Sequence, residues 1–244
     1  MRNEAQFPIS AVGCAWRRFM LSMKRMADLL GAGILIALLL LVLTGLALAV
    51  WLDSGRPILY KSRRHGRGGS SFSMYKFRTM VPDAEQRLQQ IRHLNLAQGN
   101  QVKILNDPRC TRVGRLLRRT SLDELPNLLN VIRGEMSLIG PRPHTLDEYP
   151  VVTPELLARL EMRPGITGLW QVMARNSTAE AVRAFYDRRY ITTWSLWLDL
   201  RIALRTPVVV LGCNGGTPET ATAGVEYADG RESLPDSLEM GTGV

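Results

Sequence analysis

The sequence predicts an α+β protein that is mainly helical, with a membrane-embedded N-terminal helix, interfacial amphipathic helices and one small domain. Three features predict it: an uncharged apolar run near the N-terminus, a short alternating strand pattern, and apolar residues at helical spacing in the remainder. The 244 residues suffice for one domain with appendages, and the 45% apolar content provides for a hydrophobic core.

A membrane helix is expected over residues 27–52, after a basic N-terminal segment at residues 1–26. The stretch from Leu29 to Leu52 carries no charged residue, and it is long enough to cross the hydrocarbon core. A buried helix of a soluble core is the alternative, but the length of the run disfavours it. A cleaved signal peptide fits poorly because the run starts late and has no clear A-x-A cleavage site.

Basic residues flank both ends of this run: Arg17, Arg18, Lys24 and Arg25 before it, and Arg56, Lys61, Arg63, Arg64 and Arg67 after it. The positive-inside rule places both clusters in the cytoplasm, which a straight span cannot satisfy. A re-entrant helix that bends and returns to the same face would satisfy it, and Thr44–Gly45 is the mid-run candidate for the bend. The residues alone leave both topologies open.

The small domain is expected to cover residues 53–214. Its glycine- and serine-rich stretch from His65 to Ser71 indicates a loop or hairpin turn, and FSMYKF at residues 72–77 alternates as a short strand does. The elements expected next are a polar helix from Ala84 to Ala97, a turn at Asn106–Arg109 and helical spacing from Arg112 to Ile132.

The last predicted helix is amphipathic and has the sequence WSLWLDLRIAL. Its helical spacing places Trp194, Trp197, Leu198 and Ile202 on one face. Tryptophan next to arginine suits a helix lying on a bilayer, and an ordinary packed helix is the alternative. Residues 215–244 are small, polar and acidic, and they are expected to form a disordered tail.

The net charge of +9 includes this tail, where six carboxylates accompany one arginine. The rest of the chain is therefore strongly basic, which points to nucleic acid, anionic lipid or phosphorylated small molecules as partners. The cysteines, Cys14, Cys110 and Cys213, lie far apart, so neither a disulfide framework nor a zinc site is expected.

Asp123 and Glu124 stand side by side within this basic body. One interpretation is structural: Ser121 and Glu124 match a capping box, although Pro126 would disturb the helix that follows. The other is chemical, because adjacent carboxylates repel unless a cation lies between them. Carboxylates, arginines and Mg²⁺ are typical of phosphate chemistry, and a carboxylate can also attack phosphorus.

Taken together, the motifs resemble the bacterial sugar transferases, monotopic phosphoglycosyl transferases that move a sugar-1-phosphate from a nucleotide sugar to polyprenyl phosphate. In chain order these are KRMAD, RHGRGGSSF, YKFRTM, DPRCTRVGRLLRRTSLDELPN, NVIRGEMSLIGPRP, RPGITGLWQV and WSLWLDLRIALRT. The chain departs from the family at Leu40–Leu41, where the membrane helix usually has Ser-Pro, and at Asn127, where glutamine is common. With one hydrophobic segment it is similar to the family's minimal members.

The resemblance implies a role for each matching residue. Asp123 would be the nucleophile, forming an aspartyl-phosphosugar intermediate with release of UMP, and would hold the family's Mg²⁺ cofactor. Glu124 would orient or deprotonate the lipid phosphate. Phosphates would be bound by Lys76, Arg78, Arg118 and Arg142.

The resemblance also implies partners and a location. The expected partners are a UDP-sugar, polyprenyl (undecaprenyl) phosphate and bilayer lipids; downstream glycosyltransferases and a homodimer are further candidates, and no nucleic acid is expected. A catalytic domain on the cytoplasmic face of the bacterial inner membrane would initiate a cell-surface glycoconjugate, such as an exopolysaccharide or lipopolysaccharide. The alternative is a membrane-anchored basic protein that binds anionic lipid or nucleic acid without catalysis, which leaves the acid pair unexplained.

Overall fold

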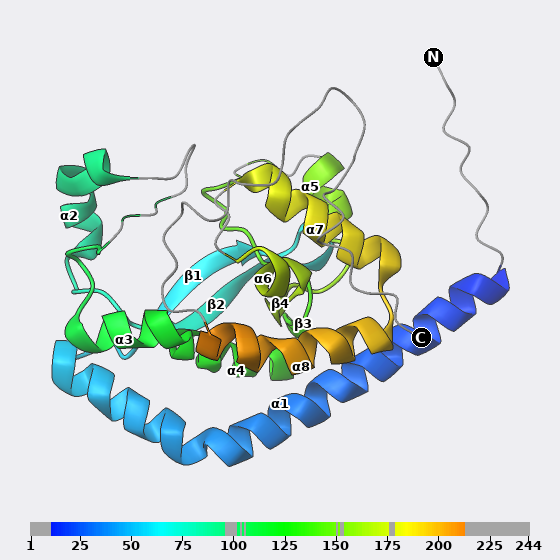
Figure 1. Ribbon diagram of the computed structural model, residues 1–244, viewed down its shortest axis with the longest axis horizontal. Helices are drawn as coiled ribbons and strands as arrows, with labels where there is room; N and C mark the ends of the chain where they lie inside the picture. The colour runs from blue at the N-terminus through cyan, green and yellow to red at the C-terminus, as the bar shows by residue number, and fades with distance from the viewer. Residues whose placement is uncertain are drawn as a thin grey trace.

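The computed structural model describes residues 11–95, 102, 104, 106–149, 151, 154–175 and 179–212 (Figure 1). Helices dominate this part of the chain, and two small sheets accompany them, as the sequence predicts. The acidic segment 215–244 lies outside the described residues.

The first sheet is a hairpin that contacts the segment carrying the acid pair. β1 (Leu59–His65) pairs antiparallel with β2 (Ser71–Phe77), and the glycine-rich turn between them contains the short 3₁₀ turn η1 (Arg67–Gly69). The strand and turn expected from the sequence are confirmed, and β1 is an additional strand. In the second sheet, β3 (Ser137–Ile139) runs parallel to β4 (Gly165–Thr167).

The stretch expected to be helical from Arg112 to Ile132 consists of three elements rather than one. They are α3 (Arg112–Thr120), the 3₁₀ helix η3 (Leu122–Asn127) and α4 (Leu128–Arg133). Ser121 ends α3 in the left-handed conformation, with φ of 57°, which L-residues adopt only rarely. Before this region, α2 (Ala84–Ile91) and the 3₁₀ turn η2 (Arg92–Leu94) form most of the expected polar helix, and residues 96–97 lie outside the described part.

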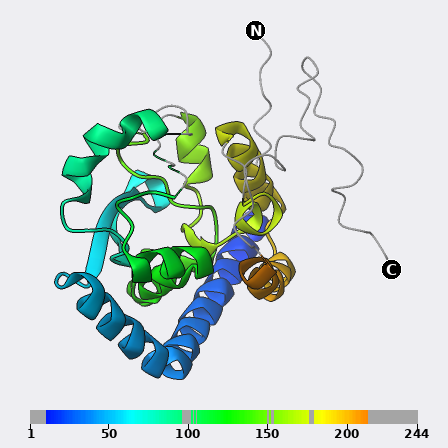
Figure 2. The same ribbon diagram turned by 60° about the vertical axis from the view of Figure 1, so that its left-hand side comes forward.

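Helix α1 (Ala11–Ser54) is 44 residues long, so the predicted boundary between residues 26 and 27 falls within it. In the described part of the chain it is the one helix long and apolar enough to cross a membrane. Figures 1 and 2 show that α1 is bent into two arms. Thr44 Oγ1 donates a hydrogen bond to the carbonyl oxygen of Leu40 at 2.9 Å, the type of bond expected to bend the helix.

Both arms of α1 pack against the same domain. In the N-terminal arm, Ala32 joins the core of β2 and α4; in the C-terminal arm, Val50 joins the core of β2 and α3. Leu38 and Leu41, which lie between them, are 73% and 86% exposed. The arms are therefore attached to the domain while the bend projects from it as an apolar surface.

Two charged residues fix the N-terminal arm of α1 to the domain. Lys24 Nζ donates to Asp199 Oδ2 at 2.7 Å and to the carbonyl oxygen of Ile139 at 2.9 Å. Asp28 accepts hydrogen bonds from Ser137 Oγ and from the backbone N–H of Leu138. The N-terminal arm of α1 is thus held by buried polar contacts as well as by apolar packing.

The C-terminal half contributes α5 (Pro154–Arg159), α6 (Leu169–Met173), α7 (Glu180–Thr193) and α8 (Leu196–Gly212). The expectation that four residues share one face of the last helix is wrong. Trp194 precedes α8, Leu198 and Ile202 are buried, and Trp197 is 58% exposed. The helix has a second apolar stripe, here called the outer stripe, which is exposed and consists of Trp197, Leu200, Leu204, Val208 and Leu211.

Candidate active site

The acid pair lies in the first turn of η3, between the left-handed Ser121 and Pro126. The Ser121 side chain does not cap this helix, and its Oγ accepts a hydrogen bond from Arg175 Nη2 at 2.5 Å. The Glu124 carboxylate bonds to side chains outside η3. The capping-box interpretation therefore does not describe these residues, and both carboxylates are available for other roles.

Glu124 is held by two cations. Its Oε1 atom lies 2.7 Å from Lys76 Nζ and 3.1 Å from Arg142 Nη2. Burial alone would raise the pKa of Glu124, but the charges and hydrogen bonds of Lys76 and Arg142 outweigh it and hold the pKa well below its usual range. Glu124 is therefore ionised at any physiological pH.

Asp123 has a different environment, although it is the next residue. It is 9% exposed, and in the described part of the chain its carboxylate accepts no hydrogen bond and joins no ion pair. Burial raises its pKa; the charge of Glu124 adds to the rise, while Lys76, Arg118 and Arg142 oppose it. Asp123 is thus a carboxylate surrounded by positive charge but bonded to none of it.

Three of the four predicted phosphate-binding residues gather around this pair. Lys76 comes from β2, Arg142 from the loop after β3 and Arg118 from α3, where Arg118 Nε donates to Thr79 Oγ1 at 2.9 Å. Their charges all act on Asp123. The basic ring expected around the acid pair is therefore assembled from elements far apart in the sequence.

Arg78 makes its hydrogen bonds to another part of the chain, the end of α1. Its Nη2 atom donates to the carbonyl oxygen and the hydroxyl of Ser54 and, at 2.7 Å, to the carbonyl oxygen of Gly55. These groups lie at the C-terminal end of α1, where helix carbonyls lack intrahelical partners. The buried guanidinium therefore caps α1, and the assignment of Arg78 to phosphate binding stays a prediction.

Arg64 is a site residue that the sequence analysis did not identify. Its Nη1 atom donates to the carbonyl oxygen of Pro143 at 3.0 Å, which joins β1 to the loop carrying Arg142. Burial and the charge of Arg142 lower its pKa to about 10, against the opposing effect of Glu148 and Glu124. In the sequence it is hidden in the basic cluster after the membrane run.

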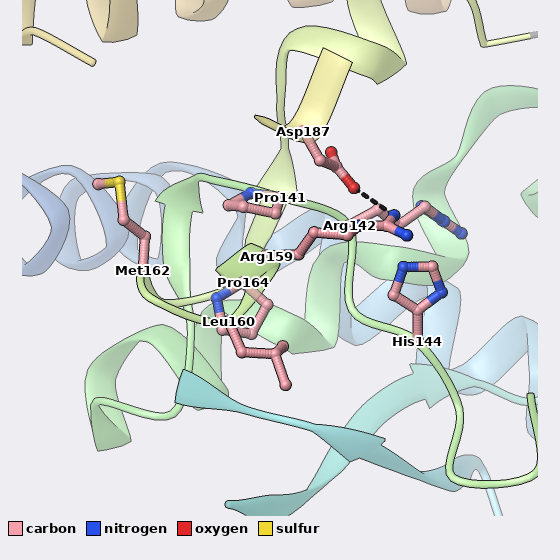
Figure 3. Close-up of a pocket in the computed structure, with 8 residues that line it drawn as sticks. All are labelled: Pro141, Arg142, His144, Arg159, Leu160, Met162, Pro164 and Asp187. Atoms are coloured by element: carbon pink, nitrogen blue, oxygen red, sulfur yellow. Dashed lines mark hydrogen bonds and ion pairs between the residues drawn. The ribbon is translucent and has the colours of Figure 1, made fainter. Parts of the chain in front are cut away.

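A charged network lies next to Arg142. Arg142, His144, Arg159 and Asp187 line one small pocket, in which Arg159 pairs with Asp187 at 2.7 Å (Figure 3). His144 Nδ1 lies 3.3 Å from Glu148 Oε2. Burial raises the pKa of Asp187 to about 6, although Arg159 opposes the rise. Arg159 and Asp187 are 28 residues apart in the sequence and leave no local signal, so sequence reasoning missed their pairing.

The residues present fit one mode of Mg²⁺ binding. No group of three or more His, Cys, Asp or Glu that could hold a metal occurs among the described residues. Mg²⁺ is usually held by one or two carboxylates together with substrate phosphates and water rather than by an all-protein cage. Asp123, whose carboxylate accepts no hydrogen bond among the described residues, could supply one such carboxylate.

Residues 19–213 match the bacterial sugar transferase family. The UDP-galactose-lipid carrier transferase of Erwinia amylovora is 43% identical over 197 residues, covering 79% of this chain and 41% of that protein. The exopolysaccharide production protein ExoY of Rhizobium meliloti is 43% identical over 196 residues, covering 77% and 85%. The UDP-glucose:undecaprenyl-phosphate glucose-1-phosphate transferase of Caulobacter vibrioides is 44% identical over 196 residues, covering 75% and 67%.

The chain spans about two fifths of the Erwinia protein and of the galactosyl transferase CpsE of Streptococcus agalactiae, which are 41% and 42% covered. The family match nevertheless includes the acid pair, the ring of cations and both arms of α1. On that match and these identities, the chain belongs to the bacterial sugar transferase family.

Proposed function

We propose that this protein transfers a sugar-1-phosphate from a UDP-sugar to polyprenyl phosphate and releases UMP. The observation that carries the proposal is the unbonded Asp123 carboxylate inside a ring of cations, next to a Glu124 that is already paired. The names of the Caulobacter and Erwinia relatives, a glucose-1-phosphate transferase and a lipid carrier transferase, point the same way. A binding protein without catalysis would have no use for an unpaired buried carboxylate.

The reaction would proceed in two displacements at one phosphorus. In the first, an Asp123 oxygen attacks the phosphorus that carries the sugar; the bond to the bridging oxygen breaks, and UMP leaves with the electron pair. In the second, an oxygen of polyprenyl phosphate attacks the same phosphorus, and the Asp123 carboxylate leaves. Asp123 thus returns unchanged, and the lipid carries a diphosphate-linked sugar.

Lys76, Arg118 and Arg142 are proposed to hold the diphosphate, because preorganised cations stabilise the charge that builds on the phosphoryl oxygens. When bound at Asp123 and the diphosphate, Mg²⁺ would neutralise part of the same charge. Glu124 is a poor base, since its pKa is held far below its usual range. Its proposed role is therefore to position Lys76 and Arg142. Of the two roles expected from the sequence, orienting the lipid phosphate is favoured over deprotonating it.

The proposed location is the cytoplasmic face of the bacterial inner membrane, with α1 re-entrant. Figures 1 and 2 show α3, α4 and α8 between the bend of α1 and the remainder of the domain. Exposed apolar side chains occur on these helices at Leu116, Leu129, Ile132 and the outer stripe of α8. Such a surface suits helices lying in the plane of a bilayer. Initiation of a surface glycoconjugate, downstream glycosyltransferases and a homodimer remain predictions.

The test is turnover by the purified full-length protein in detergent or nanodiscs, with UMP release measured for a panel of UDP-sugars. Multiple turnovers are expected for at least one sugar, only when UDP-sugar, polyprenyl phosphate and Mg²⁺ are all present. Excess EDTA is expected to stop the reaction, and Asp123→Asn is the matched inactive control. A protein that only binds lipid or nucleic acid would release no UMP with any sugar.

A further inference from the structure

A second pocket lies away from the acid pair, between α6, α7 and α8. Its volume is about 260 Å³, and its lining includes Leu169, Arg189, Thr193, Trp197, Leu198 and Arg201. None of the residues assigned to the proposed reaction lines it. The pocket therefore offers space and charge that the catalytic proposal does not use.

Two arginines give the pocket its positive charge. Arg189 comes from α7 and Arg201 from α8, and neither forms an ion pair with a carboxylate in the described part of the chain. The Arg201 guanidinium lies 5.2 Å from the centre of the Trp197 ring, a cation–π contact that holds it at the mouth. The positive charge of Arg189 also acts on the buried Tyr186 hydroxyl and partly offsets the rise in its pKa that burial causes. Both charges thus face the pocket and lack an anion.

The interior of the pocket is apolar below these charges. Leu169 and Leu198 are buried and belong to the core shared by α6, α7 and α8. Outside the mouth, the outer stripe of α8 continues from Trp197 to Leu211, which is 83% exposed. A small soluble anion would contact the arginines alone. A ligand with a charged head and long apolar chains would contact the arginines, the apolar interior of the pocket and the outer stripe of α8.

We propose that this pocket binds the headgroup of an anionic glycerophospholipid, with its phosphodiester between Arg189 and Arg201 and its acyl chains along the outer stripe of α8. Guanidinium groups bind phosphate oxygens in a bidentate fashion, and tryptophan and arginine at a membrane surface favour anionic lipid. A lipid seated there would tie α7 and α8 to the bilayer.

The test is lipid retention by the full-length protein, measured by native mass spectrometry during titration with phosphatidylglycerol or phosphatidylcholine. We expect the wild type to bind phosphatidylglycerol about tenfold more tightly than phosphatidylcholine, and the double variant Arg189→Gln/Arg201→Gln to lose that preference. The control is Arg188→Gln/Arg205→Gln, which removes the same charge from exposed positions on the same two helices outside the pocket. Thr193→Trp keeps both arginines and fills the mouth, so it is also expected to lose the lipid.

Any one of four results with the two lipids would overturn the proposal. They are unchanged phosphatidylglycerol binding in Arg189→Gln/Arg201→Gln, an equal loss in the control, unchanged binding in Thr193→Trp, and equal affinity for the two lipids. Glycerol 3-phosphate provides the remaining arm: displacement of phosphatidylglycerol at equal concentration would show a site for soluble phosphate instead of a lipid. Circular dichroism on each variant checks that it is folded, and none of these measurements depends on catalytic turnover.

Discussion

At the scale of single residues, the adjacent carboxylates of Asp123 and Glu124 have opposite environments. Glu124 is neutralised by Lys76 and Arg142, while Asp123 is buried without a bonded partner. Environments that separate the pKa values of neighbouring acids usually separate their roles. We therefore propose a supporting role for Glu124 and the reaction itself for Asp123.

The raised pKa of Asp123 predicts the pH dependence of its attack on UDP-sugar. Only the carboxylate attacks phosphorus, so the rate should fall as the pH drops through a value above the ordinary 3.8 of aspartate. Glu124 should not contribute to this fall in rate, the acidic limb of the pH profile, because its lowered pKa keeps it ionised there. Single-turnover UMP release, measured as a function of pH, gives the position of the limb. Lys76→Gln removes a charge that lowers the pKa, so its limb should move to higher pH; a limb that stays in place would contradict the assignment.

Lys76 and Arg78 are two residues apart, and their placement predicts different effects of substitution. Lys76→Gln should abolish most activity, because it removes a cation from the site. Arg78→Gln should lower the free energy of unfolding by about 2 kcal/mol, because it leaves the C-terminal end of α1 without its donor. Activity and denaturant unfolding measured on both variants check this. A stable but inactive Arg78→Gln would instead support phosphate binding by Arg78.

At the scale of elements, the position of α3 depends on close backbone contact with the segment that follows β2. A Cβ atom at Gly114 would lie 2.0 Å from the carbonyl oxygen of Thr79, and Thr79 Oγ1 also accepts the hydrogen bond from Arg118. The same contact therefore places the helix and one of the cations of the site.

Gly114→Ala should push α3 away from Thr79 and destabilise the protein by about 2 kcal/mol, the usual cost of overpacking. Because Arg118 moves with α3, activity should fall as well. The control is Gly33→Ala in α1, where a Cβ atom meets nothing within 4 Å. Thermal unfolding and UMP release compare the two; equal behaviour would show that α3 does not depend on this contact.

At the scale of the whole molecule, the two arms of α1 attach to a single domain, which supports a helix that returns to the side it entered. The test is cysteine labelling in intact cells, on a background lacking Cys14, Cys110 and Cys213. Arg18→Cys and Ser70→Cys introduce exposed thiols before and after the membrane run. An impermeant maleimide should label neither until the cells are opened. Labelling of position 18 alone in intact cells would mean that α1 spans the bilayer.

Local signals predicted much of this molecule. The uncharged run predicts α1, Thr44 predicts the bond that accompanies its bend, and FSMYKF predicts β2. The adjacency of Asp123 and Glu124 marks the acid pair without any knowledge of its partners. β1 was missed because LYKSRRH is too basic to alternate as a strand does, and it forms by pairing with β2.

The remaining differences come from long-range contacts. The break at Ser121 depends on a left-handed serine, which residue preference does not favour. The role of Arg78 depends on the end of α1 returning to β2, and Arg64 reaches the site through the Pro143 carbonyl. In α8, an exposed apolar stripe beside a buried one cannot be told from a single wide face by spacing alone.

The central claim is that Asp123 carries the phosphosugar, and covalent labelling tests it most directly. The full-length protein is incubated with Mg²⁺ and a UDP-sugar labelled at the phosphorus that bears the sugar, without polyprenyl phosphate, and is then denatured and examined for label. The wild type and Asp83→Asn, which alters an exposed carboxylate, should retain label that hydroxylamine removes. Asp123→Asn should retain none. Equal labelling of Asp123→Asn, or peptide mapping of the label to another residue, would contradict the account.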